Sequence, residues 1–227
     1  MELLTGALRG SMSELIGSFL TVFVGLFPIV NPLGMAPIFL RLTSDATAAT
    51  RARLAWQIAF GGFVLMAVSL FVGSHILAFF GLTITAVQIA GGLVVMAAGW
   101  RMLQQGSDAR AQAHHTPEPD DTIMRRAFFP LTMPLTVGPG TISVAITLGT
   151  RGAETTRLVW TATGGLLAAL AVAATIYLSY RFAANVLRRL GETGTDIFMR
   201  LSAFILLCLG VQIVTNGVAG LPFLVGK

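Results

Sequence analysis

Two stretches of the chain place proline, glycine and small polar residues inside apolar sequence. The first, FPIVNPLGMAP at residues 27–37, carries Asn31, Pro32 and Gly34. The second, FPLTMPLTVGPGTIS at residues 129–143, carries Thr132, Thr136, Gly138, Gly140, Thr141 and Ser143. An amide, several hydroxyls and backbone groups freed by proline can donate and accept hydrogen bonds without carrying charge. Such a set suits the binding of a small neutral or zwitterionic molecule rather than acid–base chemistry.

Helix ends at these prolines and glycines would supply the charge complement of a zwitterion. A helix N-terminus presents free N–H groups and the positive end of its dipole, which suit a carboxylate. The unpaired carbonyls of a helix C-terminus suit an ammonium group. The central parts of both stretches contain no Asp, Glu, Lys or Arg, so the site has no obvious proton carrier.

Every candidate residue also has a purely structural interpretation. The prolines can kink two helices for packing, and Asn31 can bridge helices instead of contacting a ligand. The hydroxyls of the second stretch can bond back to their own helix. Thr141 directly follows Gly138-Pro139-Gly140, a predicted helix start, and is the strongest candidate among them. Gln88 and Gln212 lie within apolar runs and need partners, so both join the candidate site.

The elements that must position these residues are membrane-spanning helices. The chain has 227 residues, of which 55% are hydrophobic and 11% charged, and its mean hydropathy is +0.79. Runs long enough to cross a ~30 Å hydrocarbon core predict an all-α membrane protein, and they are residues 13–40, 54–80, 84–103, 127–149, 157–181 and 197–220. The polar stretch 104–126 separates a first three-helix unit, 1–103, from a second, 127–227.

The two units resemble each other in sequence. Residues 27–37 align without a gap to residues 129–139, and five of the eleven positions are identical: a phenylalanine, three prolines and a leucine. Because three spans precede the second copy, that copy enters the membrane from the opposite side. The expected fold is therefore a 3+3 inverted-topology repeat in which spans 1 and 4 are broken at the Pro/Gly motifs.

The basic residues predict the orientation of these spans. If both termini lie on one side, that side carries only four of the 15 basic residues, and the other side carries Arg41, Arg51, Arg53, Arg101, Arg110, Arg125, Arg126, Arg181, Arg188, Arg189 and Arg200. The richer side is expected to be cytoplasmic, so both termini are predicted to be periplasmic. The net charge of +5 forms no basic face with interleaved aromatics, which argues against nucleic-acid binding.

NPLGMAPIFLRLT at residues 31–43 and PLTVGPGTIS at residues 134–143 resemble the two signature segments of the MarC family, within the wider LysE-type exporter superfamily. The resemblance runs from about Ser13 to Val218. It implies a bacterial inner-membrane protein and, for some members, secondary transport, with export the expected direction, of small neutral amino acids such as alanine and glycine. The polar stretch 104–126 lies outside the pattern.

Other function classes fit less well. A channel, or an exporter of another small polar or drug-like solute, would use the same architecture, but no charged pore stripe is evident. An enzyme would need paired His, Asp, Glu or Cys groups at membrane depth, and none is evident. No phosphate-binding glycine loop, metal-ligand cluster or cofactor motif is found. The expected partners are the amino acid substrate and the lipid bilayer, with a homo-oligomer possible.

Overall fold

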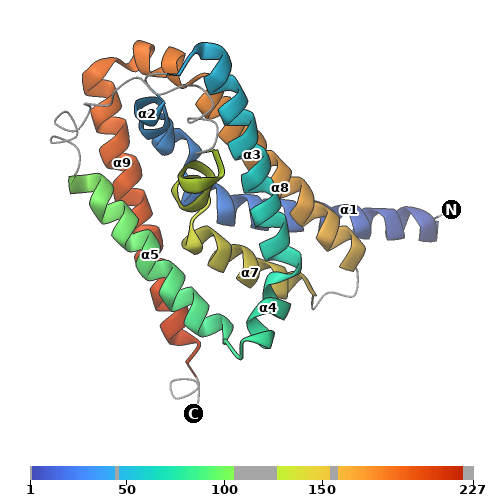
Figure 1. The fold of residues 1–227 in the computed structure, drawn as a ribbon. Coiled ribbons are helices and arrows are strands. Elements are labelled where there is room, and N and C mark those ends of the chain that lie inside the picture. The colour runs from blue at the N-terminus through green and yellow to red at the C-terminus, as the bar shows by residue number, and fades with distance from the viewer. Residues whose placement is uncertain (1, 44–45, 105–126, 154–157, 222–227) are drawn as a thin grey trace.

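The computed structural model describes residues 2–43, 46–104, 127–153 and 158–221, and these residues form helices and turns without strands. The helices are α1 (Glu2–Val30), α2 (Pro32–Leu42), α3 (Ala48–Phe71), α4 (Gly73–Phe79), α5 (Ile84–Gln104), η2 (Ala127–Thr136), α7 (Pro139–Ala153), α8 (Leu158–Arg181) and α9 (Ala183–Ala219). Figure 1 shows them as a bundle in which α5 and α9 lie side by side. Apart from Gln104, which ends α5, the predicted division at 104–126 falls outside the described residues.

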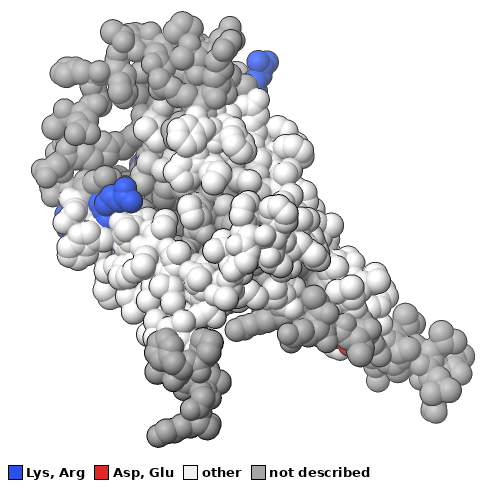
Figure 2. All heavy atoms as spheres, turned by 60° about the horizontal axis from the view of Figure 1, so that its bottom comes forward, with Lys and Arg blue, Asp and Glu red and all other residues white. Residues whose placement is uncertain are grey.

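The described helices confirm the predicted membrane class. Five are long and apolar enough to cross a membrane: Gly10–Leu40, which joins α1 to α2, and Ala48–Phe71, Ile84–Gln104, Leu158–Arg181 and Thr193–Ala219. Counting η2 and α7 as one bent span gives six. Large apolar side chains such as Phe60, Val159 and Phe204 are exposed, and charged groups are sparse on the face seen in Figure 2. Such a surface suits lipid better than water.

Two helices differ from the expected apolar runs. The run at 54–80 is divided at Val72 into α3 and the short α4. The last helix begins at Ala183 rather than near 197, and it contains a kink at Gly191, whose φ is 69°. Hydropathy reports only the apolar part of a helix, so it does not detect a helical turn built from polar residues. The positive φ explains a glycine at the kink.

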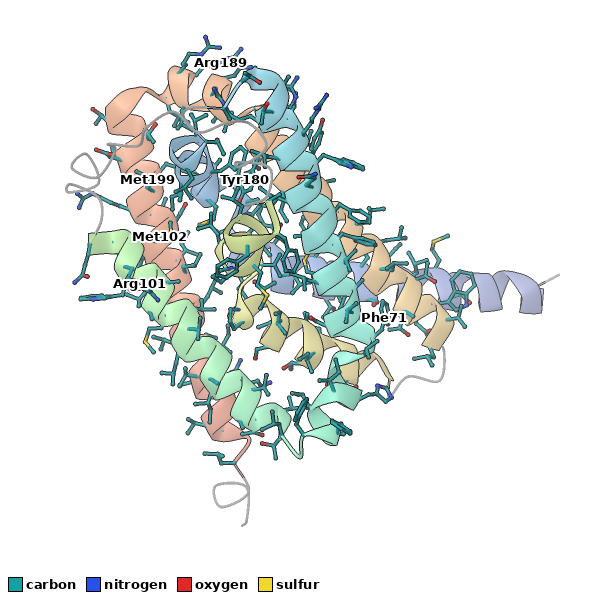
Figure 3. The ribbon with its side chains drawn as sticks, in the orientation of Figure 1. Phe71, Arg101, Met102, Tyr180, Arg189 and Met199 are labelled. Atoms are coloured by element: carbon teal, nitrogen blue, oxygen red, sulfur yellow. The ribbon has the colours of Figure 1, made fainter. Side chains whose placement is uncertain are left out.

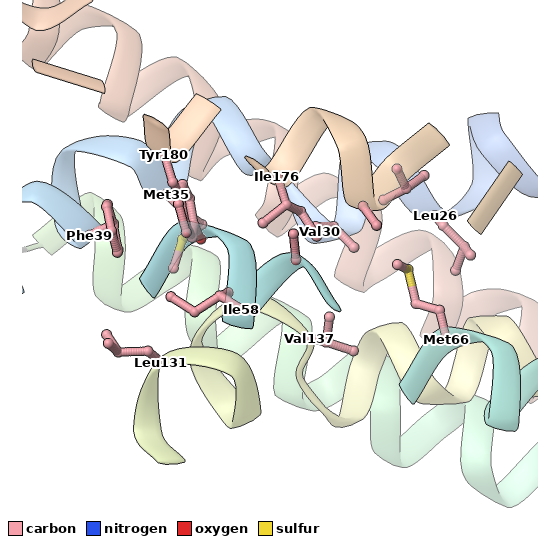
Figure 4. Close-up of a cluster of buried hydrophobic side chains, with 14 of the residues drawn as sticks. Leu26, Val30, Met35, Phe39, Ile58, Met66, Leu131, Val137, Ile176 and Tyr180 are labelled. Carbon is pink, nitrogen blue, oxygen red and sulfur yellow. The ribbon is translucent and has the colours of Figure 1, made fainter. Parts of the chain in front are cut away.

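One buried hydrophobic cluster joins most of the helices. It contains Leu26 and Val30 of α1, Ile58 of α3, Ile176 of α8, and Val137 between η2 and α7, and all are at most 1% exposed. Figure 4 shows these side chains converging from the three helices and from the segment between η2 and α7. The cluster includes a residue from each Pro/Gly motif, because Val30 directly precedes Asn31 and Val137 directly follows Thr136.

Glycines bring the backbones of α5 and α9 close together. A Cβ built on Gly99 would lie 2.6 Å from the Leu207 amide nitrogen and 2.9 Å from the Ala203 carbonyl oxygen. Gly210 of α9 meets the backbone of Met96 in α5 in the same way. Small residues at such crossings let two helices pack by van der Waals contact, which drives helix association in lipid.

This contact predicts opposite effects for two Gly→Ala substitutions. Gly99→Ala should lower the melting temperature of the detergent-purified protein, because its methyl group meets backbone that cannot rotate away. Overpacking of this kind typically costs about 1–3 kcal/mol. Gly17→Ala on α1 is the matched control, since a Cβ there has no neighbour within 4 Å, and alanine is the better helix former. Equal melting temperatures for the two variants would contradict the α5–α9 contact.

Candidate functional site

The junction between α1 and α2 is built around Asn31. Its φ is 46°, which makes it the one non-glycine residue with positive φ among those described. Asparagine tolerates this left-handed conformation better than most residues. The Asn31 side-chain oxygen accepts a hydrogen bond from the Gly34 amide at 3.2 Å, as an N-cap does. Pro32 starts α2, where its missing N–H costs nothing.

The same side chain leaves one polar group without a partner. The Gly34 N–H can only donate, so the Asn31 oxygen takes this bond and the NH₂ group is left for another partner. The Asn31 Nδ2 atom is buried and has no hydrogen-bond partner. A buried donor without a partner is costly, and a ligand acceptor would remove that cost. Gly34 is needed beside it, since a Cβ there would overlap the Asn31 amide.

The second motif forms a wider helical turn followed by a bend. Phe129 and Met133 have non-helical φ and ψ within η2, and η2 and α7 meet at 66°. The Thr132 hydroxyl donates to the Ala127 carbonyl, and the Thr136 hydroxyl donates to the Leu131 carbonyl, each at 2.7 Å. Both hydroxyls therefore bond back to their own segment and satisfy carbonyls that the irregular turn would otherwise leave free.

Tyr180 completes this arrangement and was missed by the sequence analysis. Its hydroxyl lies 2.9 Å from Thr136 Oγ1. Thr136 has one proton, which it gives to the Leu131 carbonyl, so the Tyr180 hydroxyl is the donor between the two side chains. The Tyr180 ring stacks on Phe39 of α2, with ring centroids 4.5 Å apart, and Figure 3 shows it inside the bundle. A tyrosine near the end of an apolar run needs a hydroxyl partner, and that is the signal that could have identified it.

The start of α7 is packed against α5. Its first helical hydrogen bond runs from the Ile142 amide to the Gly138 carbonyl. Gly140 lies against the Gly91 carbonyl, 3.1 Å from a built Cβ, and Ser143 donates to the Val87 carbonyl at 2.7 Å. Thr141 is 2% exposed. Ser143 therefore joins two helices, and Thr141 is the buried hydroxyl at this helix start.

The two glutamines have different surroundings. Gln88 of α5 is partly buried and donates from Nε2 to Thr147 Oγ1 of α7 at 3.2 Å, so it belongs to the α5–α7 contact. Gln212 is exposed and donates to Asn216 one turn along its own helix at 3.0 Å. The structure therefore places Gln212 on the outer face of α9, away from the buried set.

The uncharged character of the site extends to its surroundings. Apart from Tyr180 with its hydroxyl, the buried polar residues in the described part of the chain are all Thr or Ser, and they include Thr132, Thr136, Thr141 and Ser143. No group of three His, Cys, Asp or Glu residues in that part could hold a metal ion. The arrangement can bind by hydrogen bonds from an amide, hydroxyls and backbone, with no charged side chain to hold a cationic or anionic substrate.

A helical membrane bundle with an uncharged candidate site at two irregular segments defines the chain as an integral membrane protein. Comparison with known proteins identifies its family. The model of the MarC family integral membrane proteins matches residues 16–221. The chain belongs to this family and is a multi-pass inner-membrane protein.

Alignments to curated relatives cover almost the whole length of those relatives. The chain is 32% identical over 204 residues to the UPF0056 membrane protein YhcE of Escherichia coli K12, covering 88% of this chain and 91% of the relative. It is 34% identical over 206 residues to the UPF0056 inner membrane protein MarC of Salmonella typhimurium LT2, covering 86% and 91%. The MarC protein of Citrobacter koseri gives 34% over 209 residues, with the same coverage. No solved structure matches the chain.

The Thr136–Tyr180 bond predicts a difference between the two tyrosines of α8. Tyr180→Phe should lower the free energy of unfolding by about 1 kcal/mol, because it removes one buried hydrogen bond and keeps the ring. Tyr177→Phe is the matched control, since Tyr177 packs edge-on against Trp56 and is only partly buried. Thermal unfolding in detergent measures both. An equal loss of unfolding free energy in the two variants would show that the Thr136–Tyr180 bond does not stabilise the protein.

Proposed function

We propose that this protein is a secondary transporter of small neutral amino acids such as alanine and glycine, working as an exporter. The observation that carries the proposal is the buried Asn31 Nδ2 group, which lacks a partner at a left-handed break between two helices. A substrate carboxylate accepting from this amide would relieve its unmet hydrogen bond. The absence of charged side chains among the buried polar residues described favours a substrate of zero net charge.

An inverted repeat of two three-helix halves underlies the proposed mechanism. Three features support it. Helices α3 and α8 both have 24 residues. Gly81 follows the end of α3 by ten residues and Gly191 follows the end of α8 by ten, and their φ angles are 67° and 69°. Equal helix lengths and matched left-handed glycines are expected of two copies of one unit.

Helix contacts support the same repeat. In the register of the aligned stretches, exchanging the two halves converts the contact of α1 with α8 into that of η2 with α3, and the contact of α2 with α8 into that of α7 with α3. It converts the contact of α5 with α7 into that of α9 with α2, and it leaves the pairs α3–α8 and α5–α9 unchanged. Figure 1 shows α5 beside α9 and α3 beside α8. A pseudo-two-fold axis between the halves would provide the symmetry that alternating access requires, with the broken segments of spans 1 and 4 as the substrate site.

The proposed orientation places both termini in the periplasm. Arg51 and Arg53 in the first turns of α3, Arg101 near the end of α5 and Arg181 at the end of α8 lie at helix ends that alternate to one side. A reporter fused after Lys227 should therefore be active as alkaline phosphatase and dark as a cytoplasmic fluorescent protein. The same reporters inserted in the stretch 104–126 should give the reverse. A cytoplasmic signal at Lys227 with a periplasmic signal at 104–126 would invert the orientation.

Transport assays in proteoliposomes test the function. Wild-type protein should carry labelled alanine or glycine with saturation and counterflow, and carry little lysine or glutamate, because nothing in the site pairs a third charge. Asn31→Gly removes the amide but permits the left-handed backbone, and should weaken substrate affinity about 5- to 150-fold, as loss of a ligand hydrogen bond does. Thr141→Ala should reduce transport in the same direction.

The control for amide loss is Asn216→Ala, on the exposed side of α9, which should transport as the wild type does. Asn31→Ala adds strain at the left-handed position and should be less stable than Asn31→Gly. If wild-type protein moves no neutral amino acid in either direction, the proposed substrate class is wrong. If both Asn31→Gly and Thr141→Ala transport normally, the helix breaks do not form the site. Flux without saturation or counterflow would indicate a channel.

A further inference from the structure

The first part of α9 lies between two membrane spans. The span in α8 ends at Arg181, and the next apolar span begins at Thr193 within α9. The residues between them, 182–190, start α9 and precede the kink at Gly191. In Figure 1 this part crosses one end of the bundle, from α8 to the long part of α9. Because it joins two consecutive spans, it must lie near the membrane surface.

This interfacial segment, residues 182–190, has an apolar stripe with a basic edge beside it. Phe182, Val186 and Leu190 recur every four residues and are 46%, 42% and 43% exposed, so they form one outward stripe. Ala183 faces the bundle and is 1% exposed. An exposed apolar stripe on a surface helix is the feature that inserts between lipid headgroups and contacts acyl chains.

The basic edge of the segment lines an open depression. Asn185, Arg188 and Arg189 line it, and all three residues are exposed. The Asn185 oxygen accepts a hydrogen bond from Arg188, which orients that guanidinium. Figure 3 shows Arg189 extending outward at the same end of the bundle. Residues 182–190 contain two arginines and no acidic residue, so the depression carries a local positive charge.

We propose that the interfacial segment binds the headgroup of an anionic phospholipid. Arg188 and Arg189 would donate to the phosphate oxygens, since guanidinium groups match phosphate geometry with paired hydrogen bonds. Phe182, Val186 and Leu190 contact the acyl chains of the same lipid. The phosphate headgroup and the acyl chains of one lipid thus each have a matching surface on the interfacial segment. A soluble phosphate would use the arginines alone and would not need the apolar stripe. Arginines near a membrane surface also favour anionic over zwitterionic lipid.

Lipid titration of the purified protein in a neutral detergent tests the proposal. Native mass spectrometry and thermal unfolding should show that phosphatidylglycerol binds and stabilises the protein, and that phosphatidylcholine does so far less. Arg188→Gln with Arg189→Gln should weaken phosphatidylglycerol binding about thirtyfold, and either single substitution about fivefold. Arg101→Gln, an exposed arginine at the end of α5, is the matched control and should bind like the wild type.

A second pair of variants separates lipid from free anion. Val186→Ser with Leu190→Ser keeps both arginines, and it should also weaken phosphatidylglycerol binding. Inorganic phosphate alone should leave the melting temperature unchanged. Equal binding of both lipids, or unchanged binding by the arginine variants, would overturn the proposal. Stabilisation by inorganic phosphate, with no effect of the Val186 and Leu190 substitutions, would show a soluble-anion site instead. These readouts do not depend on transport, so they stand apart from the proposed function.

Discussion

The structure depends on one constraint, which is that backbone groups freed from a helix inside a membrane must find partners within the protein. An unsatisfied N–H or carbonyl in hydrocarbon costs several kcal/mol. Pro32, Pro134 and Pro139 each remove a donor from an apolar span. The chain answers with short local bonds: the Asn31 oxygen takes the Gly34 amide, and two threonine hydroxyls take the Ala127 and Leu131 carbonyls. Irregular backbone can therefore remain buried.

Glycine contacts supply the second requirement, which is that lipid be kept away from the irregular segments. Gly140 and Gly91 bring the start of α7 against α5, and Gly99 and Gly210 bring α5 against α9. Gly61 of α3 lies beside Thr132, 3.1 Å from a built Cβ to the Thr132 methyl carbon. In lipid, close backbone approach replaces the hydrophobic effect as the source of helix affinity. The small residues therefore position the site.

The sequence predicted the class and the places of irregularity, because hydropathy and Pro/Gly positions depend on local chemistry. It did not predict the different geometries of the two motifs. The first forms a local left-handed junction within the single apolar span Gly10–Leu40, and the second bends by 66°. The difference follows from residue 31 and its counterpart 133: asparagine caps the next helix, whereas methionine has no polar group to do so. The hydrogen bond of Tyr180 to Thr136 and the exposed position of Gln212 depend on packing between distant helices. One sequence does not specify that packing.

The two motifs are also unequal in their hydrogen bonding, and this bears on the proposed mechanism. At the first motif the Asn31 NH₂ group is buried and unbonded. At the second the Thr136 hydroxyl donates its single proton to a carbonyl and accepts from Tyr180, so it has no donor left for a ligand. In a transporter built from inverted repeats, each half takes in turn the environment of the other. Under that mechanism the structure represents one of two states, with the substrate donor on the first half free and the second half closed by Tyr180. Release of the Tyr180 bond, rather than a change at Asn31, is then the step that distinguishes the other state.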